Sequence, residues 1–173
     1  MMTAASGARD SAPASSFTWG VGDTISFSAT ASDPEQGSLP ASAFTWTAII
    51  KHCPTPATCH THPYQTFAGV SSGSFSAPDH EYPAHIELTV TAKDSSNQTA
   101  SRTLVVQPKT TTITLQASPV GLFCALNDGG SNTPFTATVI QGSRNSVSAP
   151  PQTSDNVLYE LGSWSDGGAA SHD

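Results

Sequence analysis

The sequence predicts an all-β protein, and three features support that fold class. Charged residues make up only 11% of the chain, so the Lys, Glu and Arg that exposed helices use are scarce. Apolar residues alternate with Ser and Thr over short segments, which is the pattern of strands with one buried face. Turn sequences rich in Gly, Pro, Asn and Asp separate these segments. No segment carries a sustained helical repeat of apolar residues, so no long helix is expected.

Alternation within residues 17–108 predicts the strands of a first unit. "DTISFSATASD", "AFTWTAIIKH" and "HIELTVTAKD" each place apolar side chains at every second position. Between the first two, "DPEQGSLP" has the Asp, Pro and Gly of a turn, and "SRTLVVQP" is predicted as a closing strand. The positions predicted to face the core are Ile25, Phe27, Ala29, Ala31, Phe44, Trp46, Ala48, Ile50, Ile86, Leu88, Val90 and Ala92.

Residues 109–173 are predicted to form a second, smaller β-module. Short strand-like segments such as "TITLQASP" and "PFTATVIQGS" alternate with "NDGG" and "SDGG", which we interpret as Asp-Gly turns of the hairpin type. Large apolar side chains are few, so the module is marginal alone and is expected to pack on the first unit or to continue beyond Asp173. Residues 1–16 are predicted to be a disordered tag or linker.

Four stretches of the first unit resemble a PKD-like (immunoglobulin-like) domain of the kind found after a glucose/sorbosone dehydrogenase-like β-propeller in secreted bacterial proteins. They are "GDTISFSATASDPEQGSLPASAFTWT", "HTHP", "GSFSAPDHE" and "IELTVTAKDSSNQTASRTLVVQP". The second unit resembles the small β-module that often follows. The resemblance implies an immunoglobulin/PKD-like β-sandwich and a smaller β-sandwich module, both non-catalytic. "TWTAIIKH" replaces the Trp-Asp-Phe-Gly-Asp-Gly run of standard PKD domains, so the ligand roles of that run are not carried over.

Charge and hydropathy limit the partners. The net charge is −7 with 6 Lys and Arg, which argues against nucleic acid and against an anionic membrane surface. No apolar run approaches the ~20 residues of a membrane-spanning helix. The N-terminal segment lacks a signal-peptide core, and both ends suggest a fragment of a larger secreted, extracellular protein. We expect a monomer.

The three cysteines predict one disulfide and one free thiol. Cys53 and Cys59 enclose a short Pro- and Thr-rich loop, and we predict that they are bonded, the alternative being that both are reduced. Cys124 lies in the apolar run "VGLFCAL" and is predicted to be a buried free thiol.

Histidines gather around the same loop and form the candidate metal site. His60 and His62 are two positions apart, so an extended chain places both on one face with their Cα atoms about 6.6 Å apart. A Cys53–Cys59 bond would bring His52 beside His60, and His80 in "APDHE" is the expected fourth member. Imidazole-rich sites suit zinc or copper. The alternative is that these are surface histidines bonded to their neighbours; His85 and His172 are expected to lie outside the group.

Two weaker candidates remain. Asp33, Glu35 and Asp94 lie at strand ends and could bind calcium at one end of the sandwich, or serve only as turn residues. Aromatic side chains outside the predicted core could stack on sugar rings or cover the edge of the core. The candidates are Trp19, Tyr64, Phe67, Tyr82, Tyr159 and Trp164, of which Tyr64, Tyr82 and Trp164 are preferred.

Three functions fit these patterns. The principal prediction is a secreted, non-catalytic accessory module that binds polysaccharide or a cell-surface glycan, or that spaces an attached catalytic domain. The alternative is a zinc- or copper-binding module at the His cluster. The third is a small metalloenzyme, for which a pocket and an open coordination position are required. Ser-His-Asp chemistry is not predicted, and no catalytic residue is assigned.

Overall fold

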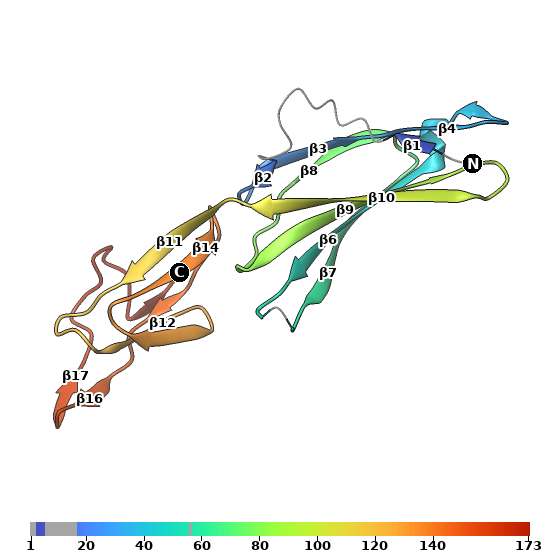
Figure 1. The fold of residues 1–173 in the computed structure, drawn as a ribbon. Helices are drawn as coiled ribbons and strands as arrows, with labels where there is room; N and C mark the ends of the chain where they lie inside the picture. Colours follow the sequence, from blue (N-terminus) through green and yellow to red (C-terminus); the bar gives the residue numbers. More distant parts are fainter. Residues whose placement is uncertain (1–2, 6–16, 56) are drawn as a thin grey trace. The chain divides into compact units, whose positions relative to one another are not determined.

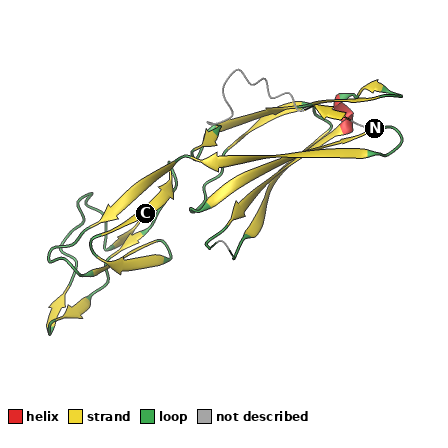
Figure 2. Ribbon diagram, viewed as in Figure 1, coloured by secondary structure: helices red, strands yellow, loops and turns green. Residues whose placement is uncertain are grey.

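The computed structural model describes residues 3–5, 17–55 and 57–173, and these residues form an all-β protein (Figures 1 and 2). The one helical element within these ranges is a short 3-10 turn, Ala41–Ala43, so the predicted all-β class is confirmed. The chain divides into two units after Lys109, and residues Ile140–Gly142 belong to the first of them. No helix in the described ranges is long and apolar enough to cross a membrane.

The first unit is organised around a five-stranded sheet (Figure 1). Its strands β6, β7, β9 and β10 run antiparallel to their neighbours, whereas β2 runs parallel to β10. In spatial order the strands are β2 (Thr18–Trp19), β10 (Thr99–Pro108), β9 (Ala84–Lys93), β6 (Phe44–His52) and β7 (His60–Ala68).

One face of this sheet forms the main core. The apolar positions predicted from alternation are all buried, none more than 8% exposed. Strands β3 (Thr24–Ser28) and β8 (Ser72–Ser76) pair with each other and contribute aromatic rings to the same core. The ring of Phe27 lies 4.4 Å from that of Trp46. Trp19 is fully buried and donates its indole N–H to the carbonyl of Val106 at 3.1 Å, so the expectation that Trp19 is an exposed stacking residue is wrong.

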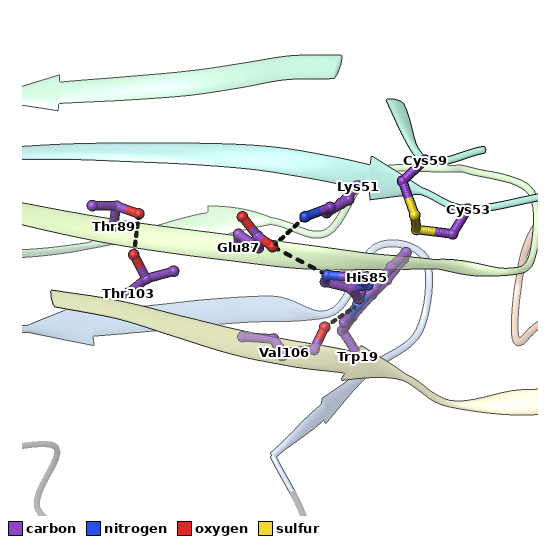
Figure 3. A network of polar contacts seen from close by, with 9 residues as sticks. All are labelled: Trp19, Lys51, Cys53, Cys59, His85, Glu87, Thr89, Thr103 and Val106. Atoms are coloured by element: carbon purple, nitrogen blue, oxygen red, sulfur yellow. Dashed lines mark hydrogen bonds and ion pairs between the residues drawn. A yellow bond between two sulfur atoms is a disulfide. The ribbon is translucent and has the colours of Figure 1, made fainter. Parts of the chain in front are cut away.

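The opposite face of the sheet carries a set of polar contacts (Figure 3). The hydroxyls of Thr89 and Thr103 are hydrogen-bonded across β9 and β10 at 2.7 Å. Glu87 lies between Lys51 and His85, at 3.5 and 3.4 Å. His85 therefore has an acidic partner on this face, outside the histidine group, as expected. Exposed ion pairs of this type contribute little to stability.

The remaining strands of the first unit form a small sheet of order β1-β4-β5. These strands are β1 (Thr3–Ala5), β4 (Thr30–Asp33) and β5 (Gly37–Ser38). Thr3–Ala5 pairs with β4 although it lies in the segment expected to be disordered. The rest of that expected linker, residues 1–2 and 6–16, lies outside the described residues.

The second unit consists of smaller sheets. Strand β11 (Thr110–Leu115) pairs with β14 (Phe135–Ile140), and β16 (Gln152–Ser154) pairs with β17 (Val157–Tyr159). A four-stranded sheet contains, in order, β13 (Gly129–Asn132), β12 (Phe123–Leu126), β15 (Val147–Ser148) and β18 (Ser171–His172). Its core cluster of buried residues consists of Leu115, Cys124, Leu126 and Val139 in the described part of the unit, which agrees with the scarcity of large apolar residues in the sequence.

One hairpin of this unit was not recognised in the sequence. Asp155 and Asn156 connect β16 to β17 with φ angles of 50° and 60°, and Ser154 pairs with Val157. Positive φ at both central residues is the geometry of a type I′ turn, which matches the twist of the flanking strands. The turn therefore uses Asp-Asn rather than the Asp-Gly pairs that we had expected to mark hairpins.

His172 belongs to strand β18. Its Nε2 lies 2.9 Å from a carboxylate oxygen of Asp166, and its Nδ1 lies 2.8 Å from the carbonyl oxygen of Ala169. The bond to Asp166 is the main cause that raises the pKa of His172, and the Ala169 carbonyl adds to it. Asp166 also accepts the N–H of Gly168, and this bond, with His172, lowers the pKa of the carboxyl. The His172–Asp166 pair therefore links β18 to the preceding turn.

The first prediction concerns the pH range in which the His172–Asp166 pair stabilises the fold. Because the folded chain holds the proton of His172 more tightly than the unfolded chain, its stabilising effect is complete below the ordinary value of 6.5 and is lost as the pH rises through the raised pKa. In D166N, the His172 pKa measured by NMR titration should fall toward 6.5, since the amide carries no charge. An unchanged pKa would show that Asp166 is not its cause.

Candidate metal centre

Four histidines converge at one end of the five-stranded sheet. His52 ends β6, His60 and His62 begin β7, and His80 lies in the connection between β8 and β9. In the antiparallel register, His52 is opposite His60 and Ile50 is opposite His62. Directly opposed side chains project from the same face of a sheet, so these histidines share the face that carries the core. They extend the row of buried side chains on β6 toward solvent.

A β-bulge in β7 allows this arrangement. Ile49 is paired with Pro63, whereas the adjacent Ala48 is paired with Gln65, so Tyr64 is the extra residue. A bulge shifts the alternation of a strand by one position. His62 and Phe67 are therefore both directed to the core side, although their separation in sequence is odd. Without the bulge, one of the two would project from the polar face.

The four imidazoles are arranged so that each has two of the others as neighbours. Their centroids are 5.0 Å apart for His52 and His60, 4.8 Å for His60 and His62, 5.0 Å for His62 and His80, and 4.9 Å for His80 and His52. Each ring is tilted or edge-on to the next. The structure thus brings together the four histidines that the sequence analysis grouped.

Three of the histidines already present their nitrogens at nearly metal-binding distance. Ligand atoms of His52, His62 and His80 all lie within 4.8 Å of one another. Zn–N bonds of about 2.0–2.1 Å place two nitrogens on one ion no more than about 4.2 Å apart, so small side-chain rotations suffice. His62 is exposed and the other two are half-buried, which leaves room for such rotations. His60 is outside this group of three and could join as a fourth ligand by changing its rotamer.

The surroundings of His52 favour its neutral form. Burial lowers the pKa of His52, repulsion by His80 and His60 lowers it further, and the negative charge of Glu81 opposes these effects. His80 Nδ1 is 3.1 Å from the carbonyl oxygen of Glu81. A carbonyl only accepts, so Nδ1 must carry the proton, which leaves the Nε2 lone pair free for a metal. The lowered pKa of His52 favours its neutral form, which has a lone pair available for a metal.

A disulfide joins the two strands that carry three of the histidines (Figure 3). Cys53 and Cys59, which directly follow His52 and precede His60, are bonded, as predicted. The N–H of Cys53 also donates to the carbonyl of Pro83 at 3.0 Å, in the connection that carries His80. All three segments of the cluster are thus linked through one cysteine. Cys124 is a buried free thiol whose pKa is raised by burial, as expected for a packing residue.

The acidic residues considered for calcium are used by their own turns. Asp33 accepts the N–H groups of Glu35 and Gln36 at 3.1 and 2.9 Å, and Asp94 accepts that of Gln98 at 2.7 Å. The Gln36 side chain joins the two turns through a backbone N–H. The turns are therefore neighbours, but among the described residues their carboxylates do not form a group able to share an ion. This pattern is the turn chemistry of Asp.

The three preferred stacking aromatics do not belong to one unit. Tyr64 donates its hydroxyl to the Ser76 carbonyl at 2.9 Å and packs on Phe75, so it covers the edge of the core. Tyr82 is 44% exposed and follows His80 in the same connection. Trp164 belongs to the second unit and packs on its core.

Comparisons with protein-family models, with curated proteins and with solved structures found no match to this chain. The chemistry of the site therefore has to be inferred from its own residues. Three or four imidazoles converge at the site, and carboxylates lie only beside them. Such a set binds a borderline or soft divalent ion and has little affinity for calcium or magnesium.

The second prediction tests whether the disulfide organises the cluster. In the double variant Cys53→Ser, Cys59→Ser, the affinity for zinc should fall by about tenfold or more, which corresponds to ~1.4 kcal/mol. The loop is short, so the free energy of unfolding of the metal-free protein should change only at the low end of the ~0–5 kcal/mol range for disulfides. Competition with a chromophoric zinc chelator and thermal unfolding measure the two effects. Equal zinc affinity in both proteins would mean that strand pairing alone positions the histidines.

Proposed function

We propose that this chain is a metal-binding module that holds one zinc or copper ion between β6, β7 and the β8–β9 connection. The observation that carries the proposal is the approach of His52, His62 and His80 ligand atoms to within 4.8 Å. His60 supplies the fourth imidazole. An ion bound by these residues would add a further link between three segments that backbone hydrogen bonds and one disulfide already join.

Retention of metal, rather than turnover, is the role that we infer. Every group that converges on the candidate site is an imidazole. A cavity of about 290 Å³ is lined by residues of the second unit and includes no histidine of the cluster. A metalloenzyme at this site is therefore less well supported than a structural, storage or delivery site.

We further infer that the module is secreted and that its first unit is an immunoglobulin/PKD-like sandwich. The five-stranded sheet with β3 and β8 facing its core is compatible with that fold, and the disulfide is compatible with an oxidising compartment. The resemblance to modules that follow a β-propeller supports a position beside a catalytic domain in a larger protein. The accessory role and the metal site are compatible, since an ion can stiffen a spacer.

The third prediction is that zinc stabilises the folded chain. An ion that binds only the folded state stabilises it by about 2.7 kcal/mol at 100 times its Kd, which corresponds to a rise in Tm of roughly 5–10 °C for a chain of this size. Protein made without a His-tag should bind close to one equivalent by elemental analysis, and a chelator should reverse the rise in Tm. His62→Ala should abolish most of the zinc-dependent rise in Tm because it removes a ligand. The exposed His62 side chain contributes to no core, so the fold itself should be retained.

The matched control is His85→Ala. His85 lies on β9 but is bonded to Glu87 on the polar face of the sheet. This variant should keep both the stoichiometry and the zinc-dependent rise in Tm. A metal-free protein whose Tm responds to neither zinc nor copper contradicts the proposal, as does an equal loss in the two variants.

A further inference from the structure

A second binding site, independent of the metal centre, lies within the second unit. A cavity of about 290 Å³ opens between the end of β11, strand β12 and the segment that follows β17. Its lining includes Phe123, Tyr159, Glu160 and Trp164. The volume is at the lower limit of the ~300–1,000 Å³ typical of ligand pockets, so the cavity suits a small ligand or one unit of a polymer.

The indole of Trp164 lacks a hydrogen-bond partner. Its N–H is the buried side-chain polar atom that has no acceptor among the described residues. The other two indoles have one, since Trp19 donates to the Val106 carbonyl and Trp46 to the Val70 carbonyl. A buried donor without an acceptor costs about 1–3 kcal/mol and calls for an explanation. Because Trp164 lines the cavity, a ligand there is the natural source of the missing acceptor after a small turn of the side chain.

The lining indicates what kind of ligand fits. Phe123, Tyr159 and Trp164 offer aromatic surface, and Phe123 is 38% exposed. Glu160 is exposed and accepts hydrogen bonds, while its charge and the net charge of −7 disfavour anions. A purely apolar ligand would supply no acceptor to the indole and no donor to Glu160. A sugar ring has an apolar face for stacking and hydroxyls that both donate and accept.

We propose that this cavity binds one pyranose unit of a neutral polysaccharide, stacked on the aromatic side chains and hydrogen-bonded to the Trp164 indole and the Glu160 carboxylate. The proposal does not depend on the metal centre, because every residue in it belongs to the second unit. It assigns a definite place to the glycan contact that the sequence suggested for Trp164.

The fourth prediction uses the indole N–H as a reporter. Cellohexaose, xylohexaose, chitohexaose and mannohexaose are titrated separately into the ¹⁵N-labelled chain. At least one should shift the Trp164 indole resonance saturably and leave those of Trp19 and Trp46 in place, since both are nearly inaccessible and already bonded. Loss of one peak in Trp164→Phe assigns the resonance.

Variants then test the named contacts by calorimetry with the sugar that binds. Trp164→Phe keeps a ring but removes the donor and should weaken binding about tenfold, and Glu160→Gln should weaken it about threefold or more. Leu158→Ala is the control. Leu158 is exposed on β17, next to Tyr159, but does not line the cavity, so this variant should bind the sugar as the parent does. If Trp164→Phe does not fold, Glu160→Gln and the indole shift decide alone.

The contradicting outcomes are distinct. If none of the four sugars moves the Trp164 resonance, or if Trp164→Phe and Glu160→Gln both bind as tightly as the parent, the proposal is overturned. A shift produced only by an apolar probe such as anilinonaphthalene sulfonate would assign the cavity to apolar ligands and would overturn the sugar class. The zinc-binding results bear on a different unit, so either proposal can fail alone.

Discussion

The pairing of β6 with β7 is the constraint on which the candidate centre depends. Its register places His52 opposite His60 at the last position of the ladder, and the Cys53–Cys59 bond closes the connection immediately beyond. A slip of one residue would turn the imidazoles of β7 to the other face. The same ladder carries Trp46 in the core, so the packing that stabilises the first unit also holds the histidines in place.

Core and cluster therefore share one face of a continuous sheet. Along β6, the buried side chains Ala48 and Ile50 lead directly to His52, which is half-buried. The partial burial lowers the His52 pKa, which keeps the ring available as a ligand. The bulge at Tyr64 is required for this arrangement, because it lets β7 contribute both Phe67 to the core and His62 to the cluster.

Alternation in the sequence predicts the core positions of the long strands and the grouping of three of the four histidines. His52 continues the parity of Ile50, and the His60–His62 spacing implies a common face, so both followed from strand periodicity. The bulge did not, since it depends on packing across strands rather than on local propensity. The burial of Trp19 also escaped prediction, because a two-residue strand has no period to read. The bond between His172 and Asp166 joins residues only six positions apart, but it depends on the turn between them, which alternation does not describe. The cavity beside Trp164 arises from contacts between segments distant in sequence.

The number of imidazoles bound to one ion tests the account most directly. X-ray absorption at the zinc edge, on protein loaded with one equivalent, should show nitrogen ligands at about 2.0–2.1 Å with the outer-shell scattering of three or four imidazoles. In His62→Ala the count should fall by one. A first shell dominated by oxygen, or an imidazole count that does not change in His62→Ala, would contradict the claim that the paired strands and the β8–β9 connection converge on a single metal ion.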